Sequence, residues 1–196
     1  MGENNKIEKI FESSSNSILD SKKLSKQIEN SITLIIKSIN NGNKIVLFGN
    51  GGSAADAQHM AAEFIGRFMK ERKSFPAIAL STDSSIITAI GNDYSFEKIF
   101  SRQAESLVKK GDVIIAISTS GESKNILEGI KTSKKIGAKI ISLTGENGIK
   151  MKKNSDIFLN VPSTITSRIQ EVHRTIIHII CEMVEDELSK RDKWKE

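Results

Sequence analysis

The chain has 196 residues, and its 29 Lys and Arg against 24 Asp and Glu give a formal net charge of +5. Hydrophobic residues make up 38 % and charged residues 27 %, which is ordinary for a folded domain and excludes a disordered chain. The single cysteine, Cys181, excludes a disulfide framework and a cysteine-rich zinc motif, and the basic residues are too scattered to indicate nucleic acid.

The first 40 residues are predicted to be helical, because isoleucines recur at helical spacing from Ile28 to Ile39. Residues 1–12 are polar and charged, and no apolar run approaches the ~20 residues that a bilayer span needs. We therefore expect a cytoplasmic protein with no membrane partner. We expect a single domain over 1–196, in which residues 1–40 pack on the domain and in an oligomer, and 189–196 form a charged tail.

Short apolar runs alternate with helical patterns through the rest of the chain. Such alternation predicts an α/β protein with a parallel sheet that is covered on both faces. The carboxyl ends of its strands are where a ligand would bind. Strands are predicted at 44–48, 77–80, 113–117, 139–143 and 157–161, and helices at 53–68, 124–136 and 166–190.

Two loops that follow predicted strands have the composition of anion sites. Residues 49–53 read Gly-Asn-Gly-Gly-Ser, which suits close approach of a phosphate to a helix start, but also a tight turn with Ser53 as N-cap. Residues 118–123 carry four hydroxyls, whereas one helix cap needs only one, and this favours an anion site. Glu122 is expected to point outward. A third segment, 91–93, reads Gly-Asn-Asp, which suits either sugar hydroxyls or an ordinary turn.

Histidines are the scarcest candidates for acid–base or metal chemistry. His59 and Glu63 stand four residues apart on one helix face, where they could share a proton, bind a metal, or form an ordinary surface pair. His178 lies among isoleucines, where a histidine is more often part of the core. Gln170 and His178 are eight residues apart, or ~12 Å along a helix, so both could serve metal sites only through two subunits.

Three separated segments carry a resemblance to a known family. Residues 49–59, 117–121 and 166–173, in that order, closely resemble the phosphoheptose isomerases, which are SIS domain proteins, and the likeness extends over about residues 5–188. It implies a flavodoxin-like three-layer sandwich with a five-stranded parallel sheet and an N-terminal helical extension. It also implies a homotetramer with active sites between subunits. The implied reaction converts sedoheptulose 7-phosphate to D-glycero-D-manno-heptose 7-phosphate, a precursor of bacterial surface glycans.

The resemblance also implies roles for particular residues. Glu63 and His178 match the acid–base pair, and His59, Glu63, Gln170 and His178 match positions that bind Zn²⁺ in many members. Two positions depart from the family pattern, Ser167 where some members have Asp, and Glu122 where Asn is common. The residues expected to bind the phosphosugar are Asn50, Gly51, Gly52, Ser53, Glu63, Asn92, Asp93, Ser118, Thr119, Ser120, Ser123 and Gln170.

The required chemistry agrees with these residues. Exchange of a ketose and an aldose through an enediol needs one base for the carbon-bound proton and one acid for the oxygens, which a carboxylate and an imidazole can provide. Two alternatives remain open. One is a non-catalytic SIS adaptor that binds the bacterial replication initiator, which would have no need of Glu63 and His178. The other is an isomerase of a different phosphosugar.

Overall fold

The computed structural model describes residues 3–194, and its centre is a five-stranded sheet in which every neighbouring pair of strands is parallel. The strand order is β2-β1-β3-β4-β5, which is the flavodoxin-like order and confirms the predicted fold class. The order reverses between β1 and β3, so the ends of these two strands define the place for a ligand. The strands are β1 (Ile45–Gly49), β2 (Ala77–Ala79), β3 (Val113–Ser118), β4 (Lys139–Thr144) and β5 (Ile157–Asn160).

Both faces of the sheet are buried because the apolar residues of each strand alternate between two cores. Ile45 and Leu47 of β1 pack into the core shared with α2, α3 and α8, whereas Val46 and Phe48 pack into the core shared with α5 and α6. This explains why the strands read as continuous apolar runs in the sequence. The longer helices are α1 (Glu3–Asp20), α2 (Ser25–Asn40), α3 (Gly52–Ile65), α4 (Ser84–Asp93), α5 (Ile99–Leu107), α6 (Lys124–Ile136) and α8 (Thr166–Leu188).

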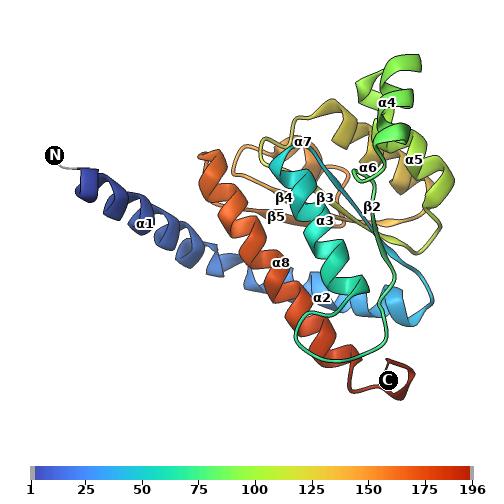
Figure 1. Cartoon of the computed structure of the whole chain (residues 1–196), viewed down its shortest axis with the longest axis horizontal. Coiled ribbons are helices and arrows are strands. Elements are labelled where there is room, and N and C mark those ends of the chain that lie inside the picture. Colours follow the sequence, from blue (N-terminus) through green and yellow to red (C-terminus); the bar gives the residue numbers. More distant parts are fainter. Residues whose placement is uncertain (1–2, 195–196) are drawn as a thin grey trace.

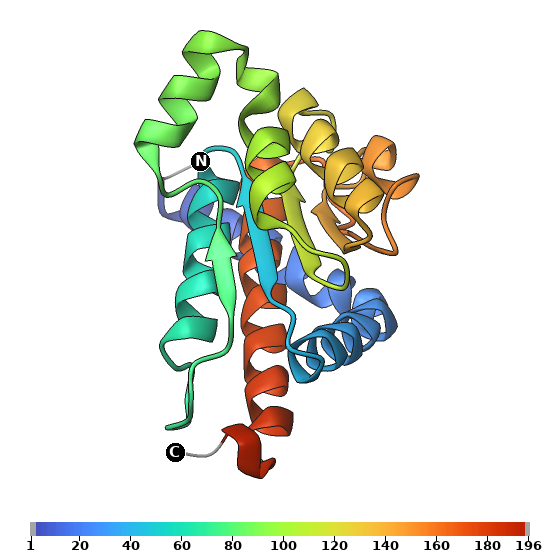
Figure 2. The same cartoon turned by 90° about the vertical axis from the view of Figure 1, so that its right-hand side faces the viewer.

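Helices α3 and α8 run side by side on one face of the sheet, as both views show (Figures 1 and 2). Short helices complete the chain at η1 (Ser21–Leu24), η2 (Phe96–Lys98), α7 (Ile149–Lys152) and η3 (Asp192–Trp194). None of the helices within residues 3–194 combines the length and the apolar character that a bilayer span requires.

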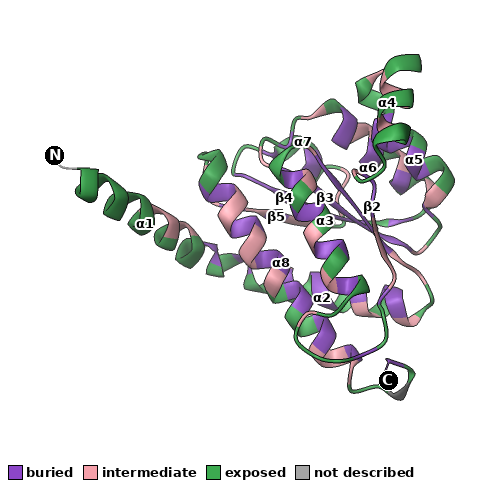
Figure 3. Ribbon diagram, viewed as in Figure 1, coloured by how far each residue is buried: buried purple, intermediate pink, exposed green. Residues whose placement is uncertain are grey.

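Helix α1 projects from the body of the protein (Figure 1) and none of its described residues is buried (Figure 3). Apolar side chains are nevertheless exposed along it, with Phe11 70 % and Ile7 53 % exposed. Two hydrogen bonds attach the middle of α1 to the start of α8. Ser14 Oγ donates to Glu171 Oε2 at 2.7 Å, and Arg168 Nη1 donates to the Ile10 carbonyl at 2.7 Å. An amphipathic helix that exposes its apolar side lacks its packing partner within one chain.

All five predicted strands are confirmed to within a residue at each end. The helix predicted at 53–68 begins at Gly52 and ends at Ile65, with Gly51 at the cap position, so the interpretation of Ser53 as N-cap is wrong. Helices α4 and α5 were not predicted. The segment 91–93 is not a turn but the end of α4, which begins where the Asp83 carboxylate accepts the Ile86 N–H at 2.9 Å.

The end of the described chain packs against the core although its neighbours are charged. The Trp194 ring meets Phe75 edge to face, with ring centroids 5.2 Å apart, and its indole N–H donates to Asn40 Oδ1 at 3.4 Å. Its carbonyl accepts the Lys73 N–H at 3.1 Å. The remainder of the predicted tail, 195–196, lies outside the described residues.

Candidate active site

Helices α3 and α8 bring three titratable side chains together. His59 Nε2 lies 2.9 Å from His178 Nε2 and 3.4 Å from Glu63 Oε1. The side chains of His59 and Glu63 are 31 % and 22 % exposed, so the cluster is accessible to a ligand from the surface. His178 is therefore not a core histidine, because its imidazole leaves the isoleucines of α8 and turns toward α3. Three of the four predicted metal ligands, which include the predicted acid–base pair, thus share one place.

An ion pair with one buried partner stands beside this cluster, since the Asp56 side chain is 6 % exposed and that of Arg174 is 37 % exposed. Arg174 of α8 meets the Asp56 carboxylate of α3, with Nη2 and Oδ1 2.6 Å apart. Burial lowers the pKa of His59, and the positive charge of Arg174 lowers it further, whereas Glu63 opposes the change. Burial also raises the pKa of Asp56, against the effect of Arg174. The neutral form of His59, which can accept a proton or bind a metal, is therefore favoured.

The glycine loop after β1 forms the entry to α3. Gly51 adopts φ +54°, which favours glycine, and no side chain caps the helix that begins at Gly52. Gln170 of α8 lies against Gly52, since a Cβ atom on Gly52 would stand 2.4 Å from Gln170 Nε2. A larger residue at position 52 would therefore displace the Gln170 side chain from the glycine loop. Both residues line a groove of about 520 Å³ together with Asp56 and Arg174.

Asn50 anchors the glycine loop to the next crossover. Its Nδ2 donates to Asn125 Oδ1 at 2.9 Å, and Asn125 Nδ2 donates back to Asn50 Oδ1 at 2.8 Å. Asn125 is 3 % exposed and lies in the first turn of α6, directly after the hydroxyl-rich loop. This pair joins the two loops at the β1/β3 switch point, where the strand order predicts a ligand.

The hydroxyl-rich loop after β3 uses its hydroxyls in two ways. Ser118 Oγ accepts the Gly121 N–H at 3.1 Å, which stabilises the turn. Thr119 and Ser120 line a cavity of about 290 Å³, whose wall also includes Ser163, Thr164 and Thr166, although Ser120 Oγ also accepts the Glu122 N–H at 3.3 Å. Glu122 is exposed and pairs with Lys150 at 2.9 Å, although it also lines this cavity. Ser123 precedes α6 at the N-cap position without a side-chain cap bond.

Within residues 3–194, we find no contact that joins Asn92 or Asp93, two of the expected binding residues, to these loops. Asn92 and Asp93 are exposed at the end of α4, and their hydrogen bond, at 2.8 Å, is to each other. Two further side chains are buried away from the site. Burial lowers the pKa of His173 to about 4, whereas it raises the pKa of the Cys181 thiol. Both side chains therefore serve packing.

The donor types of the cluster suit zinc, since two imidazoles and one carboxylate leave a fourth position for a substrate. Within residues 3–194, however, no group of three or more His, Cys, Asp or Glu side chains is already arranged as a metal site. Gln170, the fourth expected ligand, lies at Gly52 at the other end of α3. The cluster thus offers nitrogen and oxygen atoms of the types that zinc binds, but the described residues do not form a closed zinc site.

Sequence reasoning missed Asp56, Arg174 and Asn125. An acidic residue three positions before His59 was visible on the same predicted helix, and Asn125 stands two positions after the end of the hydroxyl-rich loop. Arg174 gave no signal, because its partner is 118 positions away in the sequence and only the packing of α8 against α3 joins them.

Comparison with known proteins agrees with this geometry. Residues 11–145 match the family model described as the SIS domain. A phosphoheptose isomerase from Aquifex aeolicus is 50 % identical over 187 residues, which are 95 % of this chain and 98 % of that protein.

Two solved structures of phosphoheptose isomerases also resemble this chain. The structure from Neisseria gonorrhoeae superposes with a TM-score of 0.89 at 39 % identity, and covers 94 % of this chain and 100 % of its own. The structure from Francisella tularensis superposes with a TM-score of 0.90 at 34 % identity, over 95 % and 100 % of the two chains. The chain therefore belongs to the SIS domain family and, within it, to the phosphoheptose isomerases.

Proposed function

We propose that this chain is a ketose–aldose isomerase that converts sedoheptulose 7-phosphate to D-glycero-D-manno-heptose 7-phosphate. The observation that carries the proposal is the meeting of a carboxylate and an imidazole at one accessible place, with Glu63 and His178 on either side of His59 Nε2. Membership among the phosphoheptose isomerases supplies the substrate class. An adaptor with no chemistry to perform would not need this arrangement.

The two side chains suit the proton transfers of the reaction. In an enediol mechanism a base removes the proton from C1 and returns it at C2, while an acid exchanges protons between O1 and O2. We assign the carbon base to Glu63 and the oxygen acid–base to His178. Every proton that leaves the sugar returns to it, so neither group needs a co-reactant.

The loops at the β1/β3 switch point would hold the rest of the phosphosugar. Helix α3 begins at Gly52 without a side-chain cap. The N–H groups of Ser53 and Ala54 donate to the Asn50 carbonyl at 3.0 and 3.3 Å, so an anion would be held by the Gly52 N–H and the positive end of the helix. Thr119 and Ser120 line the neighbouring cavity and offer hydroxyls to phosphate oxygens. Asn92 and Asp93 stay predicted contacts, which substrate binding or a second chain would have to complete.

We also propose that the site binds zinc, through His59, Glu63 and His178 of one chain and with Gln170 of a second subunit as a further ligand. When bound near O1 and O2, zinc would polarise the carbonyl and stabilise the negative charge of the enediolate. The support is the donor set and the lowered pKa of His59, which keeps a ring nitrogen free for a metal. Metal analysis of untagged protein tests the proposal: near-stoichiometric zinc is expected, and its absence from active protein would reject it.

A homotetramer with active sites between subunits is a further part of the proposal. Helix α1 leaves Ile7, Ile10, Phe11 and Leu19 exposed, and on α8 Met183 is 48 % exposed. Burial of such a stripe against a second copy would release apolar area from water. The cytoplasmic location and the use of the product in surface glycans stay predictions.

Turnover by the parent protein tests the function directly. Sedoheptulose 7-phosphate is incubated with the protein and the aldose product is followed by NMR. We expect turnover by the parent protein and at least a ~100-fold loss in Glu63→Gln and in His178→Gln, since general acid–base groups contribute 10²–10⁴-fold. Absence of turnover by the folded parent protein, or unchanged turnover in both variants, would reject the proposal.

A further inference from the structure

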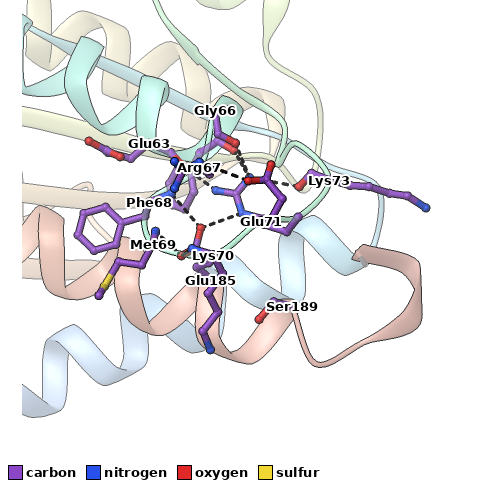
Figure 4. Close-up of polar contacts among 12 residues, drawn as sticks. Glu63, Gly66, Arg67, Phe68, Met69, Lys70, Glu71, Lys73, Glu185 and Ser189 are labelled. Atoms are coloured by element: carbon purple, nitrogen blue, oxygen red, sulfur yellow. Dashed lines mark hydrogen bonds and ion pairs between the residues drawn. The ribbon is translucent and has the colours of Figure 1, made fainter. Parts of the chain in front are cut away.

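The segment that leaves α3, which we call the strap (residues 66–73), is fastened to α8 by one buried carboxylate. Glu185 accepts the backbone N–H groups of Phe68, Met69 and Lys70 at 2.9, 2.7 and 2.8 Å (Figure 4). Its remaining partner is Arg72 Nε at 3.1 Å. The side chain of Glu185 is 2 % exposed. Such a carboxylate fixes three successive peptide units of the strap on the helix.

Arg72 fastens the strap to the end of α3. Its Nη2 donates to the carbonyl of Glu63 at 2.8 Å, and its Nη1 donates to the carbonyls of Phe64 and Gly66 at 2.9 and 3.0 Å. The last carbonyls of a helix have no partner within the helix, and Arg72 satisfies that of Glu63, whereas the Phe64 carbonyl also accepts the Phe75 N–H at 3.0 Å. Its guanidinium also stacks on the Phe75 ring, 3.9 Å from the centroid.

Arg72 and Glu185 are each connected to one member of the candidate acid–base pair. Arg72 holds the backbone of Glu63 itself. Glu185 lies seven residues, or two helical turns, after His178, and the strap it holds places the Phe68 ring against the His178 imidazole, with centroids 5.7 Å apart. The separation of the two reacting side chains therefore depends on a pair of residues that touch neither the sugar loops nor the cavity.

We infer that the buried Arg72–Glu185 pair is a positioning device for the isomerisation, which sets the placement of Glu63 and, through Phe68, the orientation of the His178 imidazole. The inference rests on the proposed function. Neither residue is a catalytic residue, because both act through groups that they hold.

The chemistry of the Arg72–Glu185 pair indicates that it positions its neighbours rather than stabilises the fold. Burial raises the pKa of Glu185, but the three N–H bonds and Arg72 outweigh it and lower the pKa overall, so the group is an anion. Burial lowers the pKa of Arg72, and Glu185 opposes that shift. Desolvation of two charges offsets most of their attraction, so such pairs add little net stability. What the pair does provide is a fixed set of directed hydrogen bonds.

The substitution Arg72→Lys tests the inference, because lysine keeps the charge opposite Glu185 but cannot span the carbonyls that the planar guanidinium reaches. We expect a ~10- to 100-fold fall in kcat with the KM for sedoheptulose 7-phosphate unchanged, since misplaced reacting groups cost that much and the sugar loops are untouched. In protein with ¹³Cε1-labelled histidine, the His178 resonance should move as the Phe68 ring moves. The parent protein must turn over in the same assay.

The matched control is Asp186→Asn, next to Glu185 in the sequence. Asp186 also pairs with the strap, through Lys70, but both side chains are 49 % exposed, and we expect kcat and the His178 resonance to stay as in the parent protein. A folded Arg72→Lys with parental kcat, or with only a raised KM, would overturn the inference, whereas an inactive parent protein would overturn the proposed function instead. If Arg72→Lys does not fold, Phe68→Leu decides: a lowered kcat with unchanged KM is expected, and parental kcat would overturn the inference.

Discussion

His173 illustrates how one buried side chain couples the stability of the fold to pH. Its side chain is fully buried in α8, and burial lowers its pKa from 6.5 to about 4. The folded state therefore keeps the imidazole neutral at a pH where the unfolded chain takes up a proton. Because the unfolded state binds more protons, stability falls as pH falls between these two values.

The shift in the pKa of His173 corresponds to a contribution of ~3 kcal/mol to the free energy of unfolding. This contribution is fully present above pH 6.5 and is lost progressively toward pH 4. The replacement His173→Leu removes this term, so its free energy of unfolding should fall less than that of the parent protein over the same range. Chemical unfolding at fixed protein concentration from pH 7 to pH 4 measures both curves. Parallel curves would show that His173 already carries its proton in the folded protein.

At the scale of elements, the hydroxyl-rich loop depends on one close approach of two backbones. Gly121 adopts φ +65°, and a Cβ atom placed on it would stand 2.4 Å from the Gly148 Cα. Gly121→Ala should therefore destabilise the protein by at least ~1–2 kcal/mol, the cost of a left-handed conformation alone. It should also lower turnover, because Thr119 and Ser120 would move.

The control for that prediction is Gly91→Ala in α4. A Cβ atom at Gly91 meets nothing within 4 Å, so alanine is accommodated in the helix and should raise the unfolding free energy by up to ~1 kcal/mol. Thermal unfolding of both variants at one protein concentration makes the comparison. Equal melting temperatures for the two variants would contradict the assigned backbone conformation.

Elements with a strong apolar pattern were predictable, and those with a weak one were not. The inner strands β1, β3 and β4 were found because each contains an apolar run that is buried on both faces. The edge strands β2 and β5 are shorter and only partly buried. Helix α4 was missed because it buries no residue, so its pattern carries little periodicity, although Asp83 is an N-cap that the sequence shows. The Gly-Asn-Asp at 91–93 was interpreted as a turn for the same reason.

For the whole molecule, the projecting helix α1 predicts how the chain assembles. The double substitution Ile7→Glu and Phe11→Glu changes two exposed apolar residues, 53 % and 70 % exposed, that touch no core of their own chain. We expect the proposed tetramer to dissociate while the secondary structure stays intact, because charges at a buried interface are costly. Light scattering with size-exclusion chromatography measures the mass, and turnover should fall with it. An unchanged oligomer would place the interface elsewhere.

The sequence by itself determined the five strands, the helices with a strong apolar pattern and the residue types at the strand ends. These are local properties: apolar runs, glycines and hydroxyls at fixed spacing, and the i, i+4 pair of His59 and Glu63. It also carried the resemblance that the comparisons confirmed.

Only the tertiary structure decided which distant residues meet. His178 turns toward His59 across 119 positions, Arg174 reaches Asp56, and Arg72 and Glu185 join across 113 positions. No local pattern contains these contacts, because they depend on the packing of α8 along α3 over the sheet. The reason is physical: propensity and periodicity act over a few residues, whereas a site is assembled from side chains that the core brings together.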